Sequence, residues 1–321
     1  MKTTVAIIYG GRSGEHEISL RSAQSIMEAL DPERYKVLQF FISKEGQWRP
    51  RPIVPEPNRN PEIDVVFPVL HGTFGEDGTV QGLLELAGLP YVGPGVLASA
   101  AAMDKEVAKR LCREAGLAVV DYVIAHGDDC AQIPFAYPVF VKPANLGSSV
   151  GITKARDCEE LRAALHTASQ YDRKVLIERA IVGQEIECSV LGNRDPIAAT
   201  PCEILPSREF YDYEDKYILD KTEFRIPPDL SAEKIEEVRR IAVAAYQALE
   251  CEGMARVDFL IEKSTGAIYI NEVNTIPGFT SISMYPKMWE HSGLPYPKLL
   301  DRLIELAIER HAAKQALKYT R

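Results

Sequence analysis

The sequence lacks the marks of several common protein classes. Its six cysteines stand far apart, at positions 112, 130, 158, 188, 202 and 251, and none belongs to a Cys-x-x-Cys pair, which argues against a zinc ribbon or a dithiol redox site. Basic residues are in the minority, with 37 lysines and arginines against 46 aspartates and glutamates and a net charge of −9. The chain therefore lacks the basic footprint of a nucleic-acid-binding protein and the positive charge that favours an anionic membrane surface.

Long uninterrupted hydrophobic runs are also missing. The longest uncharged stretch covers residues 86–103, but Pro90, Gly93, Pro94 and Gly95 break it with turn-forming residues. The apolar run 5–8 near the N-terminus is too short for the core of a signal peptide. We therefore expect a cytoplasmic protein without a transmembrane helix.

The composition is that of a globular protein, with 46% hydrophobic and 26% charged residues. At roughly 150 residues per domain, the length of 321 residues corresponds to about two domains. The pattern of strands and glycine loops divides the chain into an N-terminal α/β region over 1–95, a central region over 96–182 and a C-terminal region over 183–321. Buried-strand patterns at 3–9, 35–41 and 64–70 predict an open parallel sheet in the first region, with a helix after its glycine loop.

The other two regions have patterns of their own. Asp104 is placed to cap a helix that continues to Gly116, and residues 138–143 predict a short strand in a hairpin. Further along the chain, the pattern predicts strands at 175–178 and 183–192 and a helix over about 231–250. A hairpin over 254–274 and a charged helix complete an α/β (α+β) chain.

The hairpin over 254–274 gives the strongest chemical signal. Its alternation places Arg256 and Asp258 on a polar face, and a turn centred on residue 265 sets Asp258 opposite Glu272 and Arg256 opposite Asn274. The same alternation predicts Ile268 and Ile270 on the face of Glu272. Facing carboxylates repel each other unless a cation lies between them, and two carboxylates with an amide oxygen suit Mg²⁺. The alternative is a solvated face with an ordinary Arg–Asp pair.

A magnesium site suggests a phosphate donor, yet the sequence contains neither a Walker A motif nor the dinucleotide fingerprint Gly-x-Gly-x-x-Gly. The loop 142–151 is the better candidate, because its backbone N–H groups could surround phosphate oxygens and Lys142 supplies a positive charge. A plain turn is the alternative there. On the strand over 183–192, Glu185 and Glu187 share a polar face that could meet a ribose or simply face solvent.

Two loops are candidates for binding. Residues 206–229 lack periodicity, contain five aromatic residues and are long enough to form a lid. Residues 71–78 follow a predicted strand, so they lie at the carboxyl edge of a parallel sheet, where ligands gather. A tight turn without a ligand is the alternative for the second loop.

Taken in order, these motifs are similar to those of D-alanine:D-alanine ligases, members of the ATP-grasp superfamily. The resemblance extends along almost the whole chain and rests on residues 9–19, 71–82, 103–105, 142–151, 210–217, 255–259 and 271–278. It implies an ATP-grasp fold preceded by an N-terminal preATP-grasp domain. It also implies a homodimer that uses ATP; the acidic composition already argues against a nucleic-acid or membrane partner.

The resemblance assigns roles at the nucleotide. Lys105 and Lys142 would contact the phosphates, Glu178 and the backbone near Ile181 the adenine, and Glu185 the ribose. The further nucleotide contacts that it implies are Ser149, Arg179, Lys216, Phe259, Asn271 and Glu272. Position 179 departs from the pattern, because related ligases often have lysine there. Two Mg²⁺ ions, with Mn²⁺ as a substitute, would be held by Asp258, Glu272 and Asn274.

The remaining roles concern the two amino-acid substrates. Glu15 would hold the ammonium of the first D-alanine, and His71 would neighbour its carboxylate. The residues implied around the second D-alanine and the tetrahedral oxyanion are Arg256, Ser283, Met284 and the N–H of Gly278, and those implied in closing the lid are Ser148, Lys216 and Tyr217.

The implied reaction is ATP-dependent formation of D-alanyl-D-alanine for peptidoglycan, with release of ADP and phosphate. A carboxylate is a poor acyl donor until it is phosphorylated, so an acylphosphate and a closed, water-free site are expected. Two alternatives remain: a ligase of the same fold that takes D-lactate or D-serine second, and an inactive nucleotide-binding regulator. The implied Lys216 and Tyr217 favour D-alanine, and the regulator would have lost a metal ligand or a phosphate lysine.

Overall fold

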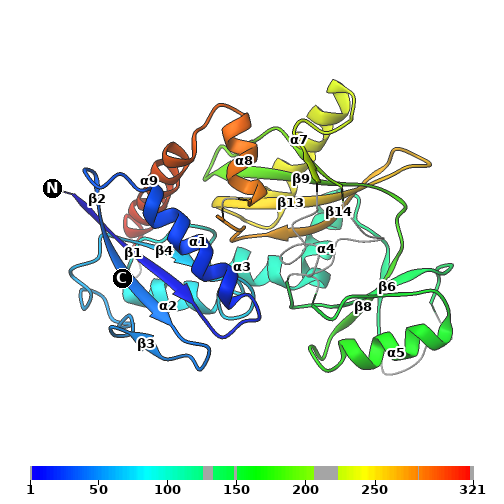
Figure 1. Cartoon of the computed structure of the whole chain (residues 1–321), viewed down its shortest axis with the longest axis horizontal. Coiled ribbons are helices and arrows are strands. Elements are labelled where there is room, and N and C mark those ends of the chain that lie inside the picture. Colours follow the sequence, from blue (N-terminus) through cyan, green and yellow to red (C-terminus); the bar gives the residue numbers. More distant parts are fainter. Residues whose placement is uncertain (1, 126–132, 148–149, 206–222, 281, 319–321) are drawn as a thin grey trace.

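The computed structural model describes residues 2–125, 133–147, 150–205, 223–280 and 282–318. Three sheets organise this part of the chain (Figure 1). None of the helices described has the length and apolar character needed to cross a bilayer. The fold is the mixed α/β arrangement that the sequence predicts, with a mostly parallel sheet followed along the chain by two antiparallel sheets.

The first sheet has the order β3-β2-β1-β4. Its strands are β1 (Thr3–Gly10), β2 (Tyr35–Ile42), β3 (Trp48–Arg49) and β4 (Val65–Val69). Strands β2, β1 and β4 are parallel, as predicted, and the short β3 adds an antiparallel edge. The helices that follow are α1 (His16–Ala29), α2 (Thr79–Ala87) and α3 (Val96–Met103). The loops after β1 and β4 therefore emerge at one edge of this sheet.

The second sheet is small and antiparallel, with the order β5-β8-β6-β7. Its strands are β5 (Tyr122–Ile124), β6 (Val139–Pro143), β7 (Thr153–Ala155) and β8 (Val175–Arg179), and α5 (Cys158–Ala168) covers it. The predicted hairpin at 138–143 is confirmed as β6 and β7. Val139, Val141 and Leu165 contribute to its own hydrophobic core.

The third sheet is the largest and is antiparallel, with the order β12-β11-β9-β13-β14 and β10 paired to β9. Its strands are β9 (Gly183–Gly192), β10 (Ile197–Ala198), β11 (Cys202–Leu205), β12 (Glu223–Arg225), β13 (Gly253–Glu262) and β14 (Ile268–Asn274). A core shared with α3, α4 (Lys105–Glu114) and α7 (Ala232–Ala248) covers one face. The Asp104 carboxylate caps α4 as predicted, accepting from the N–H groups of Glu106 and Val107 at 3.1 Å.

The last two helices join the first sheet to the third. These are α8 (Met284–His291) and α9 (Tyr296–Gln315). Leu299 and Leu303 of α9 lie in one hydrophobic core with Val5 of β1 and Met254 of β13. The chain's two ends thus meet in a common core, which sets the edge of the first sheet beside the strands of the third. The domain boundaries at 95 and 182 stay a prediction.

Candidate active site

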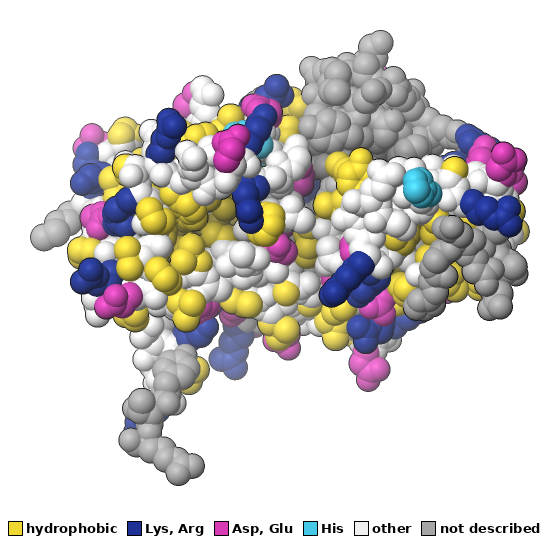
Figure 2. Space-filling model, turned by 90° about the horizontal axis from the view of Figure 1, so that it is seen from below, with side chains coloured by type: hydrophobic (Ala, Val, Ile, Leu, Met, Phe, Trp, Pro, Cys, Tyr) yellow, Lys and Arg dark blue, Asp and Glu magenta, His cyan; other side chains and the backbone are white. Residues whose placement is uncertain are grey.

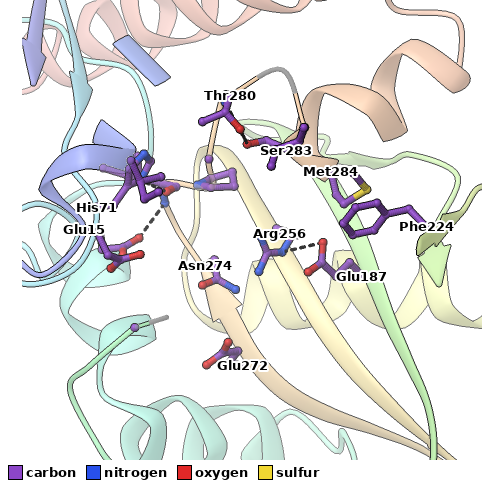
Figure 3. A pocket seen from close by; sticks show the side chains of 17 residues that line it. Glu15, His71, Glu187, Phe224, Arg256, Glu272, Asn274, Thr280, Ser283 and Met284 are labelled. Atoms are coloured by element: carbon purple, nitrogen blue, oxygen red, sulfur yellow. Dashed lines mark hydrogen bonds and ion pairs between the residues drawn. The ribbon is translucent and has the colours of Figure 1, made fainter. Parts of the chain in front are cut away.

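A pocket lies where the edge of the first sheet meets strands β13 and β14. Figure 3 shows Glu15 and His71 entering from one side and Thr280, Ser283 and Met284 from another. Arg256, Glu272 and Asn274 come from the two strands, with Glu187 of β9 beside Arg256. Three parts of the chain that are remote in sequence therefore line one pocket.

The hairpin register in this pocket is the predicted one. Asp258 pairs with Glu272 and Arg256 with Asn274, and the Asn274 amide donates to Asp258 Oδ2 at 2.9 Å. The expectation that Ile268 and Ile270 share the face of Glu272 is wrong. Phe259 pairs with Ile270, so a bulge at position 271 shifts the register and turns both isoleucines into the core.

The arginine cluster consists of Arg256, Asp258 and Glu187. The Arg256 guanidinium makes a two-pronged contact with Asp258, with both N–O distances at 2.7 Å, and its Nε lies 3.3 Å from Glu187 Oε2. Burial opposes the charge of Arg256, but Asp258 and Glu187 together raise its pKa. Among the described residues, this cluster combines one cation with two carboxylates.

The lysine cluster consists of Lys105, Lys109 and Lys142 with Glu178 and Glu272. Lys142 Nζ lies 2.7 Å from Glu178 Oε2 and donates to Asn271 Oδ1 at 3.0 Å. Lys109 Nζ lies 3.0 Å from the other oxygen of Glu178, and Lys105 Nζ lies 3.6 Å from Glu272 Oε2. Among the described residues, this cluster combines three cations with two carboxylates, and it brings together five of the predicted nucleotide contacts: Lys105, Lys142, Glu178, Asn271 and Glu272.

The metal ligands predicted from the sequence are adjacent. No group of three His, Cys, Asp or Glu side chains in the described ranges could hold a metal, so the candidate set is two carboxylates and the amide of Asn274. Oxygen donors of this kind fit Mg²⁺, which takes its remaining ligands from phosphates and water. Arg256 pairs with Asp258 at 2.7 Å, and Lys105 lies 3.6 Å from Glu272, so each carboxylate has a cation nearby.

The Glu15 side of the pocket is closely packed. An ideal Cβ on Gly72 would lie 2.7 Å from Glu15 Oε2, and one on Gly147 would lie 3.0 Å from it. Gly72 also has a φ of +74°, a conformation that side chains rarely adopt. Only glycine at these positions lets the carboxylate approach both loops.

His71 is buried behind Glu15. Its Nδ1 lies 3.0 Å from the Ile276 carbonyl oxygen and its Nε2 lies 3.1 Å from Ser22 Oγ. Burial lowers the pKa of His71, and nearby Arg256 adds to this, against the opposing effects of Glu15 and the Ile276 hydrogen bond. The imidazole is therefore neutral at pH 7, and its orientation is fixed from both sides.

The remaining wall lies between β14 and α8. Ser283 Oγ accepts from the Thr280 N–H at 2.9 Å, and an ideal Cβ on Gly278 would lie 2.8 Å from the same Oγ. Met284 begins α8 and lines the pocket beside Ser283. Gly278, Ser283 and Met284 are thus brought together as predicted.

Other predicted residues lie elsewhere. Phe259 is in the core with Val257, on the face of β13 opposite Asp258, so its side chain does not reach the pocket. Arg179 pairs with Glu262 of β13 at 2.7 Å, which ties the second sheet to the third. Glu185 is on β9, and Ile181 lies in the short link between β8 and β9. Ser148, Ser149, Lys216, Tyr217 and most of the predicted lid are outside the described residues.

Three acidic or basic residues at the site were not predicted as contacts. Glu76 lines the pocket and accepts from the N–H groups of Gly72 at 2.6 Å and Ile276 at 3.4 Å; burial, with nearby Glu15, raises its pKa to about 8. Glu187 binds Arg256, and Lys109 binds Glu178. The alternation of β9 places Glu187 on the polar face, but only the pairing of β9 with β13 reveals its partner.

Two models of one protein family together match most of the chain. The N-terminal model of the family "D-ala D-ala ligase" matches residues 4–58 and 50–94, and the C-terminal model matches 111–305. The chain belongs to the D-alanine–D-alanine ligase family. The D-alanine–D-alanine ligase of Solibacter usitatus is 63% identical over 327 residues, with 100% of both chains covered. That of Thermoanaerobacter sp. is 50% identical and covers 98% of each chain.

Solved structures agree with this assignment. The D-alanine–D-alanine ligase of Coxiella burnetii superposes with a TM-score of 0.87 at 38% identity, covering 98% of this chain and 96% of that one. The VanG D-Ala:D-Ser ligase of Enterococcus faecalis has a TM-score of 0.86 at 37% identity, covering 96% and 100%. Members with different second substrates therefore share this fold.

Proposed function

We propose that this enzyme uses ATP to join two D-alanines into D-alanyl-D-alanine for peptidoglycan, releasing ADP and phosphate. The observation that carries the proposal is the adjacency of two oppositely charged clusters in one site. Among the described residues, the lysine cluster combines three cations with two carboxylates, which suits phosphates. The arginine cluster combines two carboxylates with one cation, which suits a metal ion and substrate ammonium groups.

The first D-alanine is assigned to the side of Glu15 and His71. The Glu15 carboxylate would pair with the substrate ammonium, and the neutral His71 imidazole would lie near the substrate carboxylate. Fixing that carboxylate beside the lysine cluster aligns it for phosphorylation by ATP. The product of that step is an acylphosphate, in which phosphate becomes the leaving group.

The nucleotide is assigned to Lys105, Lys142, Glu178, Ile181 and Glu185. Asp258, Glu272 and Asn274 would hold two Mg²⁺ ions, or Mn²⁺, and such ions neutralise charge on the transferring phosphoryl group. The lysines add positive charge that is already in place before the reaction.

The second D-alanine is assigned to the side of Ser283 and Met284. Its amine attacks the acylphosphate carbonyl, and the resulting oxyanion would receive hydrogen bonds from Arg256 and the Gly278 N–H. Water would hydrolyse the acylphosphate, so the site must close during the reaction. We assign that closure to Ser148, Lys216 and Tyr217.

Product identification tests the proposal. The enzyme with ATP, Mg²⁺ and equal D-alanine, D-lactate and D-serine should give essentially only D-alanyl-D-alanine by mass spectrometry. A predominance of the D-serine or D-lactate product would overturn the substrate assignment and leave the ligase chemistry standing. The absence of any product and of phosphate release would favour the regulatory alternative.

Isotope transfer tests the intermediate separately. D-alanine labelled with ¹⁸O in its carboxylate should transfer one label to the released phosphate, because phosphorylation places a carboxylate oxygen in the P–O–C bridge. Unlabelled phosphate would exclude the acylphosphate.

We also propose a cytoplasmic homodimer. The use of ATP fits the cytoplasm.

The proposed dimer rests on exposed apolar side chains. Two leucines on the neighbouring helices α2 and α3, Leu86 and Leu97, are 65% and 68% exposed, and Figure 2 shows hydrophobic side chains across this part of the surface. Exposed apolar side chains of this kind suit a second copy of the chain. Light scattering should give twice the mass of one chain, and a monomer would contradict the proposal.

A further inference from the structure

Lys109 is the one member of the lysine cluster to which no contact with substrate, nucleotide or metal has been assigned. Its side chain is only 2% exposed, and it lies one turn from Lys105 on α4. Glu178, with its Oε1 at 3.0 Å, is its ion-pair partner within the described residues. A buried lysine is costly unless its charge is compensated, so the position of Lys109 depends on Glu178.

Glu178 is equally buried and is shared between two lysines. Lys109 lies against one carboxylate oxygen and Lys142 lies 2.7 Å from the other. Burial opposes ionisation of this carboxyl, but Lys109 and Lys142 together lower its pKa. One negative charge thus stands between two positive ones, and the further contact of Lys142 is with the neutral amide of Asn271.

We propose that Lys109 is a positioning residue for the nucleotide: it neutralises Glu178 and so leaves the charge of Lys142 available to the phosphates. This inference rests on the proposed phosphate role of Lys142. Without Lys109, Glu178 and Lys142 would form a closed neutral pair, and a phosphate would have to compete with a buried carboxylate. With Lys109 in place, Lys142 can turn toward a phosphate without leaving Glu178 unpaired.

The proposal predicts that Lys109 affects the binding of the phosphates but not the binding of the rest of the nucleotide. Adenosine has no phosphate, so its binding does not use the charge of Lys142. ADP binding does use that charge. Loss of Lys109 should therefore weaken ADP binding selectively, whereas general damage to the site would weaken both ligands.

Calorimetric titration of ADP and adenosine without metal tests this. In Lys109→Met, ADP affinity should fall at least about tenfold, the size of one charge-assisted contact, while adenosine affinity changes less than about twofold. Lys174→Met is the control, because Lys174 is another ion-paired lysine, with Asp104 and Glu106 at 2.7 and 3.2 Å. It should leave both affinities unchanged. Equal weakening of the two ligands by Lys109→Met, or a lower melting temperature alone, would overturn the proposal.

If Lys109→Met alone does not fold, the same substitution can be tested in a second variant, Glu178→Gln. Glu178→Gln removes the buried carboxylate, so Lys109 is no longer needed to neutralise it. Adding Lys109→Met to Glu178→Gln should change the ratio of ADP to adenosine affinity by less than about twofold. A further tenfold loss would show that Lys109 acts on the phosphates directly, contrary to the proposal.

The variant Lys142→Met separates a failure of this inference from a failure of the proposed phosphate role of Lys142. If Lys142→Met leaves ADP affinity unchanged, the phosphate role of Lys142 is wrong. If Lys142→Met weakens ADP binding and Lys109→Met does not, only the positioning role of Lys109 is wrong.

Discussion

The lysine cluster and the arginine cluster are built from similar groups with opposite balances of charge. The first combines three lysines with Glu178 and Glu272, and the second combines Arg256 with Glu187 and Asp258. Both are largely buried, so neither set of charges is screened as it would be on the surface. This difference supports the proposal that phosphates bind at the lysine cluster and a metal ion at the arginine cluster.

The two clusters also differ in geometry. The lysines are separate point charges that can follow a flexible chain of phosphates. The guanidinium is a rigid fork, held by both oxygens of Asp258, and presents its donors in one fixed direction. A movable group suits phosphate binding, and a fixed donor suits the oxyanion of a transition state.

Removing the Glu272 carboxylate of the lysine cluster should have the largest effect. Glu272→Gln takes away a proposed metal ligand, and we expect ATP-dependent turnover to fall by about 10²–10³-fold or more. Phosphate release at saturating Mg²⁺ measures this. The exposed Glu236→Gln, which removes only a surface ion pair with Arg239, should keep parental turnover. Retained activity in Glu272→Gln would refute its role as a ligand.

Replacing the Arg256 guanidinium by a lysine ammonium tests whether the fixed geometry of the arginine matters in addition to its charge. Arg256→Lys keeps the charge but loses the two-pronged contact with Asp258, so we expect kcat to fall about 10²-fold. Steady-state kinetics at saturating ATP and D-alanine gives this number, with the surface variant Arg302→Lys as control. A normal kcat would mean that charge alone is sufficient at the arginine cluster.

A smaller effect is expected at the wall beside Arg256. In Gly278→Ala the new Cβ would lie 2.8 Å from Ser283 Oγ and must displace it, and we expect about a tenfold loss of kcat/KM for D-alanine. Gly82→Ala has no atom within 4 Å of its ideal Cβ, so this helix variant should retain activity and gain slightly in stability. Equal activity of the two variants would show that Gly278 does not contribute to the active site.

The smallest expected effect is on the pH dependence of the melting temperature. The pKa of His71 is lowered in the folded protein, so its contribution to stability is complete above the unfolded value of about 6.5 and declines as the pH falls below it. The melting temperature of the parent should therefore drop more between pH 7.5 and pH 5.5 than that of His71→Gln. The exposed His166→Gln should keep the parental slope, and identical slopes for all three proteins would show that His71 is not held neutral.

Local patterns predicted much of this molecule. The alternation in β13 and β14 was sufficient to pair Asp258 with Glu272, because a strand presents alternate residues to one face. The bulge at Asn271 was not predictable in this way, since one extra residue leaves no mark on the hydrophobic pattern. It nevertheless decides that Asn271 reaches Lys142 while Ile270 enters the core.

The sequence did not predict which charged residues are buried at the site. Residues 105–114 read as a charged helix, and nothing in that pattern separates the buried Lys109 from the exposed Arg110. The distinction comes from β8, which brings Glu178 to Lys109 across 69 positions of sequence. Glu187 was placed on the correct face of its strand, but its partner depends on the same kind of long-range pairing.

The core shared by the two ends of the chain has a consequence for synthesis. Strand β4 ends at Val69, yet the core against it includes Leu299 and Leu303 of α9, and the Tyr35 hydroxyl donates to Asp301 at 2.9 Å. A ribosome makes the first sheet early, but the helix that covers its apolar face emerges only after residue 296. The region translated first is therefore completed last, and a nascent chain must carry this uncovered surface through most of its translation.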